Sequence, residues 1–387
     1  MIITFYSNYF NHHQMALCEA LNELPNVEFY FVETQPMEQF RKDMGWGVNS
    51  LPAYVISAYE SEEKKQLALQ LADISDAAII GSAPEWYIQR RLARNLLTFR
   101  YTERPMKEGI IKMFIPRLFL KFYRLHFKNR KKNMYVLGAS AYASYDYSLL
   151  HSYKGKCLKF GYFPKGEERS IDELLSLKSK KGEKLRLLWS GRLLKLKRAD
   201  LLIEALKRLE KEYDYELKFV AEGDEADRLK ALVDRYNLGS NISFTGFVGP
   251  DEIRELMAKS DIYIMTSNFL EGWGSVIYEA LSEGCAVIAS HACGCTPWLV
   301  KNDETGLVFK SGSVESLRKC LIRLMSSEEL RKKLSKQAHK QMQTLWNPQV
   351  AAARIAEFTD KMKVNERVHY EDGPLSDAPI LKNGWFK

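Results

Sequence analysis

The sequence predicts an α/β protein with two domains, each formed around a parallel sheet. Its length of 387 residues suits two domains of this class. Two stretches, Ile2–Val32 and Ile262–Ala289, each show the order strand, helix, strand. Parallel strands need a crossover connection, usually a helix, so this order indicates a parallel sheet with ligands at the carboxyl ends of its strands.

The composition of the chain argues against several other classes of protein. The 57 Lys and Arg residues against 49 Asp and Glu residues give a net charge of +8, which is basic but not extreme, and we expect no nucleic-acid partner. Six cysteines in a chain of this length do not indicate a disulfide framework. Met1–Tyr6 lacks the basic region and cleavage site of a signal peptide, and no run of about 18 apolar residues is present. We therefore expect a protein that folds in the reducing cytoplasm.

The first half begins with a strand–helix–strand unit that lacks a dinucleotide fingerprint. Ile2–Tyr6 is a predicted strand, Ser7–Gln14 a loop, Met15–Leu24 a helix and Val27–Val32 the next strand. The loop contains no glycine, whereas an NAD-binding loop needs Gly-x-Gly-x-x-Gly here, which argues against an NAD enzyme. His12 and His13 lie in this loop, at the edge where ligands bind, and are candidate functional residues. Further strands are predicted at Ala77–Ser82, Leu96–Thr102 and Tyr135–Ser140.

A basic amphipathic stretch, Lys107–Lys132, lies between two of these strands. Its apolar members include Ile110, Ile111, Met113, Phe114, Ile115, Leu118, Phe119, Leu120, Phe122, Tyr123, Leu125 and Phe127. Its cations are Lys107, Lys112, Arg117, Lys121, Arg124, Lys128, Arg130, Lys131 and Lys132, against the single acid Glu108. Pro116 is expected to kink or divide it. The alternatives are binding to an anionic membrane surface and a domain helix with a solvated cationic face. The many aromatic residues favour the first, and hence a peripheral protein on the inner face of the cell membrane.

The second half supplies cations at a predicted ligand edge. Phe163–Glu168 has the turn composition of a domain boundary, so we place the junction between residues 165 and 166. Leu185–Arg192 is a predicted strand that ends in a turn at Gly191, and the helix Ala199–Leu209 follows. Arg192 and Lys197 bracket this turn. Two cations at the carboxyl edge suit an anionic ligand, although solvated surface cations are the alternative.

Two further strands follow in this half. Leu217–Ala221 is a predicted strand that ends at Glu222-Gly223-Asp224, and Ile242–Val248 is a short strand and turn. Asp224 is a predicted N-cap for the helix Glu225–Tyr236. The letters of Asp224–Asp227 match a helicase box, which we reject because the chain contains no Gly-x-x-x-x-Gly-Lys-Ser/Thr loop.

The most informative stretch is the glycine loop and helix Glu271–Leu281, which follows the strand Ile262–Met265. A helix N-terminus presents N–H donors and a partial positive charge, which suit a phosphate. Glu271 and Glu279 flank this loop. Because a carboxylate repels a phosphate, we interpret both as acceptors for sugar hydroxyls. The phosphate donors would be the backbone N–H groups of Gly274, Ser275 and Val276.

Metal and nucleophile motifs are weak. His291, Cys293 and Cys295 are possible ligands close together, but zinc normally takes four ligands with Cys-x-x-Cys spacing, so buried or loop thiols are the better interpretation. The chain has no Asp-x-Asp motif for a metal–diphosphate clamp and no Gly-x-Ser-x-Gly elbow. We therefore expect no metal. Beyond this region, residues 313–345 indicate two helices, Val350–Met362 a third, and the polar tail from Val364 is expected to be loosely held.

Five motifs of this chain follow one another in the same order as in the family-four glycosyltransferases of the GT-B fold, the glycosyl transferases group 1, and the chain resembles that family. Glu271 and Glu279 match the Glu-x7-Glu pattern of the retaining members. Arg192 and Lys197 match the cation pair before the first helix of their donor domain. The other three matches are Ala221–Asp224, Ile242–Phe247 and Thr305–Val308.

The resemblance implies two Rossmann-like domains facing across a cleft. Residues 1–165 would bind the acceptor, residues 166–347 the nucleotide sugar, and the helix and tail 348–387 would pack back on the first domain. Arg192 and Lys197 would hold the diphosphate and would act in catalysis with Glu271, which would contact the donor sugar. Glu279 would accept from the ribose hydroxyls. The other donor-binding residues would be Gly191, Glu222, Gly246, Phe247, Gly274, Ser275 and Val276.

The chain departs from the family pattern at three places. Asn8–Gln14 replaces a common glycine pair, which leaves His12 and His13 as the acceptor-side candidates there. Trp298 occupies the position of a family glutamate. Glu103 takes the place of a family histidine and is the third acceptor-side candidate.

The function that the resemblance implies is that of a retaining hexosyltransferase. It would move a sugar from a nucleoside-diphosphate sugar, a UDP-sugar by preference, to a glycan or lipid-linked acceptor in cell-surface polysaccharide assembly. Cations and a helix N-terminus would stabilise the leaving group in place of a metal. The alternatives are a non-catalytic nucleotide-sugar-binding subunit of an assembly complex and a GT-B phosphorylase or epimerase.

Overall fold

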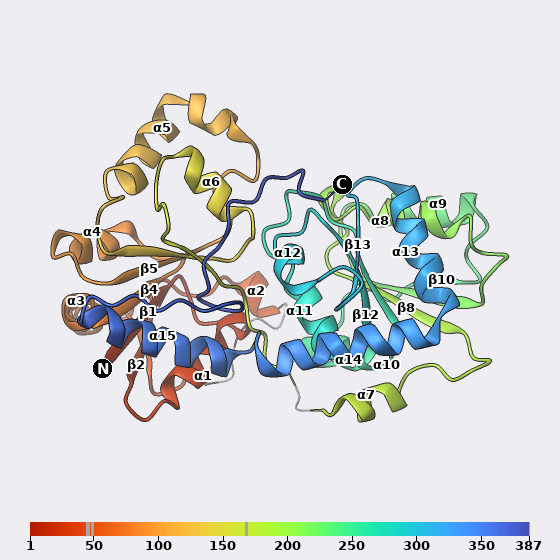
Figure 1. Ribbon diagram of the computed structural model, residues 1–387, viewed down its shortest axis with the longest axis horizontal. Helices are drawn as coiled ribbons and strands as arrows, with labels where there is room; N and C mark the ends of the chain where they lie inside the picture. Colours follow the sequence, from red (N-terminus) through yellow and green to blue (C-terminus); the bar gives the residue numbers. More distant parts are fainter. Residues whose placement is uncertain (44–46, 48–49, 167–168, 387) are drawn as a thin grey trace. The chain divides into compact units, whose positions relative to one another are not determined.

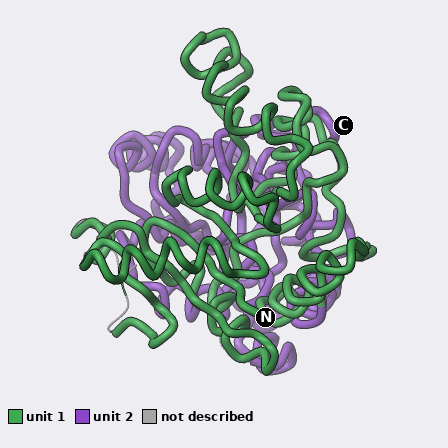
Figure 2. Tube along the Cα trace, turned by 90° about the vertical axis from the view of Figure 1, so that its left-hand side faces the viewer, with its two compact units in different colours: residues 1–165, 345–382 green, residues 166–344, 383–387 purple. Residues whose placement is uncertain are grey.

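The structure, a computed structural model, describes residues 1–43, 47, 50–166 and 169–386. These residues form two compact units, 1–165 with 345–382 and 166–344 with 383–386 (Figures 1 and 2). Of the predicted boundary turn, Glu167 and Glu168 lie outside the described residues. The units differ from the predicted domains at two places: residues 345–347 join the first unit, and residues 383–386 join the second.

The first unit contains a seven-stranded sheet in which all paired strands are parallel, in the order β3-β2-β1-β4-β5-β6-β7. The strands are β1 Ile2–Ser7, β2 Glu28–Glu33, β3 Val55–Ser57, β4 Ala77–Ile80, β5 Thr98–Thr102, β6 Met134–Gly138 and β7 Cys157–Lys159. The central strands are buried, as expected of a parallel sheet with helices on both faces. The sequence pattern does not predict β3 and β7, since three residues show little periodicity and neither strand has the clear turn composition that marks β10.

The helices of this unit correct one prediction. They include α1 His12–Asn22, α2 Gln39–Asp43, α3 Glu62–Ile74, α4 Glu85–Ala93 and α6 Ala143–Leu149. His12 and His13 lie in the first turn of α1, so their predicted position in the loop is wrong. The cause is Asn11, whose Oδ1 accepts the N–H of His13 at 3.0 Å and starts the helix earlier.

The last helix, α15 (Pro348–Lys363), belongs to the first unit, as the resemblance implies. Asn347 Oδ1 accepts the N–H of Val350 at 2.8 Å, and proline occupies the first turn, where a missing N–H costs nothing. Phe358 packs on Phe99 of β5 and Tyr135 of β6, with ring centroids 5.6 and 5.0 Å apart.

The amphipathic stretch forms three short elements. They are the 3-10 helix η1 Ile110–Phe114, α5 Pro116–Phe122 and the π-helical turn η2 Tyr123–Phe127. Pro116 is the first residue of α5, so the prediction that it divides the stretch is confirmed. Among the described residues, no helix has the length and apolar character needed to cross a membrane.

The second unit contains a six-stranded parallel sheet in the order β10-β9-β8-β11-β12-β13. Its strands are β8 Leu185–Ser190, β9 Tyr215–Val220, β10 Ile242–Phe244, β11 Ile262–Met265, β12 Ala286–Ser290 and β13 Leu307–Phe309. Its helices are α7 Ile171–Ser176, η3 Lys195–Lys197, α8 Ala199–Leu206, α9 Ala226–Arg235, α10 Pro250–Lys259, α11 Ser275–Ser282, α12 Thr296–Leu299, α13 Val314–Ser326 and α14 Glu328–Thr344. The predicted N-cap at Asp224 is wrong: Glu225 occupies that position without a side-chain cap, and Ala226 N–H bonds to the Gly223 carbonyl at 3.0 Å.

The tail after α15 is held by specific hydrogen bonds, unlike the loosely held segment that its composition indicates. Leu375 N donates to Lys159 O, and Lys159 N donates to Ser376 O, both at 2.8 Å. The tail therefore pairs with β7, the edge strand of the sheet, whose outer backbone groups need partners.

Candidate active site

The loops at the carboxyl ends of β8, β9, β10 and β11 form one edge of the second unit, which we call the loop edge. Its first contact joins the loop after β8 to the loop after β9. Leu193 N donates to Glu222 O at 2.7 Å. Gly223 has φ of +146°, and a Cβ there would lie 2.6 Å from the Leu193 carbonyl oxygen. Only glycine allows this approach, so the motif predicted at Ala221–Asp224 has a structural cause.

The loop after β11 is bonded to the loop after β8. Thr266 Oγ1 donates to the Lys197 carbonyl at 2.6 Å, and Trp189 Nε1 donates to the same hydroxyl at 3.0 Å. Asn268 N donates to Leu196 O at 2.9 Å. These bonds fix the two loops relative to each other.

The consequence is an ion pair between two predicted catalytic residues. Lys197 Nζ lies 2.6 Å from Glu271 Oε2, and the two side chains are only 15% and 14% exposed. Arg192, the third predicted catalytic residue, lies in the same loop with an exposed side chain. Gly191 begins that loop with φ of +139°, a conformation that favours glycine. The structure thus brings Glu271 and Lys197 together and leaves Arg192 accessible.

Helix α11 begins at this edge. Gly274 precedes it with φ of +89°, and its position would place a Cβ 3.7 Å from Glu271 Cγ. The N–H groups of Ser275 and Val276 lie in the first turn, where a helix offers them no carbonyl partner. The donors and the positive end of the helix dipole are therefore next to the Glu271 side chain.

Glu279 lies one turn along α11 and is half-buried. Burial raises the pKa of this carboxyl from 4.5 to about 7, Arg254 opposes the rise and Glu283 adds to it. A carboxyl group whose pKa is raised this far by burial is often found at a functional position. Its predicted contact with ribose hydroxyls stays a prediction.

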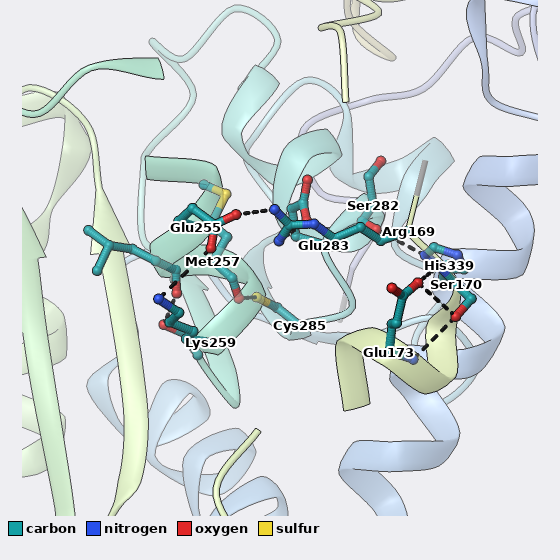
Figure 3. A network of polar contacts seen from close by, with 12 residues as sticks. Arg169, Ser170, Glu173, Glu255, Met257, Lys259, Ser282, Glu283, Cys285 and His339 are labelled. Atoms are coloured by element: carbon teal, nitrogen blue, oxygen red, sulfur yellow. Dashed lines mark hydrogen bonds and ion pairs between the residues drawn. The ribbon is translucent and has the colours of Figure 1, made fainter. Parts of the chain in front are cut away.

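The C-terminal end of α11 is fixed by a network that sequence reasoning missed (Figure 3). Arg169 pairs with Glu255 of α10 and lies 4.0 Å from Glu283, which ends α11. His339 Nδ1 of α14 bonds to the Ser282 carbonyl at 2.9 Å. These partners are far apart in the sequence and lie in polar segments, so no periodic signal marks them.

Three further predicted donor-binding residues meet at the ends of β9 and β10. Glu222 Oε1 accepts the N–H of Phe247 at 3.3 Å. Gly246 has φ of +77°, and a Cβ there would lie 3.3 Å from the same oxygen. The Phe247 ring is 51% exposed, so an aromatic face and a carboxylate lie side by side at this end of the loop edge.

The three acceptor-side candidates lie near one another in the first unit. His12 and His13 have ring centroids 3.9 Å apart, and the His13 ring lies 5.9 Å from that of Tyr162. Tyr162 donates to Glu103 Oε1 at 3.4 Å. Burial, with a contribution from His12, lowers the pKa of His13 to about 3, so it is neutral at physiological pH. Sequence reasoning missed Tyr162, which follows the short strand β7.

The part of the chain that forms the loop edge is similar to a known protein family. Residues 171–341 match the family model of the glycosyl transferases group 1. This part of the chain is a group 1 glycosyltransferase domain. It contains the paired Lys197 and Glu271, the Glu222–Phe247 contact and α11.

Two glycosyltransferases from bacteria are similar in sequence to part of this chain. The lipopolysaccharide core biosynthesis glycosyltransferase LpsE of Rhizobium meliloti is 28% identical over 149 residues, 38% of this chain and 42% of its own length. An N-acetylgalactosaminyltransferase of Campylobacter jejuni, named for a diphospho-undecaprenol acceptor, is 34% identical over 143 residues, 37% of this chain and 38% of its own. The matches thus span less than half of these relatives.

A solved structure matches nearly the whole chain. Anabaena HepE in complex with UDP has a TM-score of 0.66 and 14% identity, over 93% of this chain and 99% of its own. At this identity the likeness shows the fold, and the two parallel sheets with their helices are a GT-B fold.

Trp298, which the resemblance places at the position of a family glutamate, lies in a buried segment. Trp298 is 5% exposed and packs near Trp273, with ring centroids 5.9 Å apart. Cys293 and Cys295 are fully buried close by, and burial raises the pKa of both thiols. The segment is therefore an apolar support behind Glu271. In the described ranges, no three His, Cys, Asp or Glu side chains form a group that could hold a metal ion.

Replacing Glu279 should make the glycosyltransferase domain more stable at alkaline pH. The folded pKa of about 7 lies above the ordinary 4.5, so ionisation costs stability; the cost is absent below pH 4.5 and complete above pH 7. Glu279→Gln removes the charge, and its gain in free energy of unfolding should be larger at pH 8 than at pH 5. Urea unfolding at both values measures this, with the exposed Glu252→Gln as control. An equal gain at the two pH values would contradict the burial of this charge.

Proposed function

We propose that the protein is a retaining hexosyltransferase that uses a nucleoside-diphosphate sugar, UDP-sugar by preference, and a glycan or lipid-linked acceptor. The observation that carries the proposal is the half-buried Lys197–Glu271 pair beside the N-terminus of α11. A cation, free helix donors and a carboxylate in one place match a phosphate with a sugar attached.

The proposed reaction breaks the bond between the sugar C1 and the diphosphate oxygen and forms a bond from C1 to an acceptor hydroxyl oxygen. The diphosphate departs with the bonding electrons, and its oxygen takes up the proton that the acceptor hydroxyl loses. Lys197, Arg192 and the N–H groups of Ser275 and Val276 would stabilise the charge that grows on the leaving group. No metal is required for this step, because these groups are already positive.

The ion pair has a role in this proposal. Without a donor, Lys197 is balanced by Glu271 at 2.6 Å. A diphosphate would take over as the partner of Lys197, and Glu271 would become free to accept hydroxyl groups of the donor sugar. The exposed Phe247 ring would stack on the nucleobase beside Glu222, and Glu279 would accept hydrogen bonds from the ribose hydroxyls.

The acceptor would be recognised by the first unit. His12, His13 and Glu103, linked by Tyr162, supply the polar groups at the carboxyl edge of its sheet. The names of LpsE and of the Campylobacter enzyme refer to lipopolysaccharide and to a diphospho-undecaprenol acceptor, which supports a lipid-linked glycan in cell-surface polysaccharide assembly.

The segment Lys107–Lys132 would bring the first unit to the inner face of the cell membrane. Its exposed apolar side chains include Ile111 at 67% and Phe114 at 79%, together with Ile110, Ile115, Phe119, Leu120 and Tyr123. An apolar pocket of about 240 Å³ is lined by side chains of this segment, among them Phe119, Phe122 and Phe127, and by residues 149–151. Exposed apolar groups among cations are what an interfacial helix presents to anionic lipid.

Loss of the diphosphate cations should reduce transfer. Arg192→Ala and Lys197→Ala should each lower kcat/KM at least tenfold, or about 1.4 kcal/mol of transition-state stabilisation. Initial rates with the donor sugar measure this. Lys195→Ala, an exposed cation in the same loop, is the matched control and should be near normal. Normal kinetics in both variants would remove these residues from the site, and donor binding without any turnover in the parent protein would favour a non-catalytic subunit.

Activity should not depend on a divalent cation. The positive groups of the loop edge can neutralise the leaving group, so transfer should persist in excess EDTA. The measurement is product formation before and after chelation. Loss of activity that magnesium or manganese restores would show that a metal takes part.

Charge reversal in the amphipathic segment should weaken membrane binding. Each cation near an anionic surface contributes about 1 kcal/mol, and salt screens it. Lys121, Arg124 and Lys128 are exposed, so changing all three to Glu should strongly reduce co-sedimentation with anionic vesicles at low salt. The triple variant Lys333→Glu, Lys336→Glu and Lys340→Glu carries the same charge change in the second unit and is the control. A parent protein that ignores anionic vesicles at low salt would refute the membrane proposal and leave the donor site untouched.

A further inference from the structure

The described end of the chain contacts the second unit at His291, the residue that follows β12. Residues 383–386 belong to that unit, although 345–382 belong to the first. Trp385 Nε1 donates to the His291 carbonyl at 3.4 Å. The His291 ring lies 6.2 Å from the Trp385 ring and 5.8 Å from that of Phe386, between centroids. The tail therefore places two aromatic side chains on the residue that follows β12.

His291 is held in one orientation. Its N–H donates to Phe309 O of β13 at 3.0 Å, and its Nδ1 accepts the N–H of Ser311 at 2.9 Å. Because Nδ1 accepts a hydrogen bond, the ring is the tautomer with its proton on Nε2. A residue whose backbone N–H and ring Nδ1 are both hydrogen-bonded can transmit packing from the tail to the side chains that contact its ring.

The His291 ring also contacts Phe269. The two rings meet edge to face, with centroids 5.2 Å apart. Phe269 lies in the loop after β11, two residues before Glu271. Within that loop Glu271 N donates to Asn268 O at 3.0 Å, and Leu270 N donates to Asn268 Oδ1 at 2.9 Å. The packing of the tail therefore ends on the short turn that carries the Glu271 carboxylate.

We propose that Trp385 and Phe386 are positioning residues for Glu271. Through His291 and Phe269 they hold the loop after β11 in the conformation that places the carboxylate 2.6 Å from Lys197. The expected effect on sugar recognition rests on the proposed function, in which Glu271 contacts the donor sugar. The support that the tail gives to the loop does not depend on that function.

The geometry separates two parts of the donor. The groups proposed to bind the nucleotide, Glu222, Phe247 and Glu279, lie outside the loop after β11. Only Glu271, inside it, is assigned to the sugar. Loosening the tail should therefore weaken binding of a nucleotide sugar while binding of the bare nucleotide diphosphate is nearly unchanged.

The test compares the full chain with Trp385→Ala/Phe386→Ala and with Trp385→Phe. The first readout is hydrogen exchange of the amides of Asn268 and Glu271, which needs no ligand. The double variant should exchange there at least fivefold faster at an unchanged melting temperature, and Trp385→Phe, which keeps a ring, should recover most of the protection. Ile380→Ala, an exposed residue of the same tail, is the control and should behave as the parent.

The second readout is calorimetric affinity for UDP and UDP-glucose, and for GDP and GDP-mannose. The double variant should bind the nucleotide sugar at least fivefold more weakly than the parent does and the nucleotide within twofold. Unchanged exchange in the loop would overturn the inference. Faster exchange with an equal loss for nucleotide and nucleotide sugar would overturn the assignment to the sugar side. A parent protein that binds none of the four would contradict the proposed function, while the exchange result still decides the role of the tail.

Discussion

The close approach of Gly223 to the backbone of Leu193 is the constraint on which the loop edge depends. A side chain at residue 223 would meet the Leu193 carbonyl at 2.6 Å, so the loop after β8 would have to move. That loop carries Lys197, whose own carbonyl accepts the Thr266 hydroxyl at 2.6 Å and thereby fixes the start of the loop after β11. Glu271 is thus placed by a series of short backbone contacts, and it pairs with Lys197 without a rigid element of its own.

The loop edge contains two kinds of partly buried charge, the Lys197–Glu271 ion pair and the Glu279 carboxyl. Two half-buried charges at 2.6 Å stabilise each other, but a buried pair contributes little net stability because both ions lose water. In the proposed reaction the pair has another use: a ligand group can take the place of Glu271 as the partner of Lys197 if it carries the same charge. Glu279 shows the cost of such a site, since burial raises its pKa to about 7 and α11 must keep it there. The network of Arg169, Glu255 and Glu283 at the opposite end of α11 supplies that rigidity.

Local sequence signals predicted the parts that depend on neighbouring residues. The strand Ile262–Met265, the turn at Gly191 and the helix after Gly274 follow from periodicity and from glycine conformations, and all three are confirmed. Contacts between distant segments left no such signal: Tyr162 on Glu103, Arg169 on Glu283, and the tail on β7 all join residues whose own surroundings look like ordinary polar loops. Asn11 and Asp224 show a third limit. Both are good cap residues by type, but only Asn11 occupies the N-cap position of its helix; at α9 that position is Glu225.

The loop that carries Glu271 has properties that make support from a distant segment, the tail with Trp385 and Phe386, useful. The stretch Thr266–Gly274 forms neither helix nor strand, and segments of this kind open at lower free energy than the core does. In the proposed reaction its charged residue, Glu271, would release Lys197 and accept a ligand, so additional ion pairs would hinder exchange. Apolar packing does not have this disadvantage, because aromatic contacts hold the backbone without competing for the carboxylate. Phe269 against His291 is such a contact, and the rings of Trp385 and Phe386 complete it from the far end of the sequence.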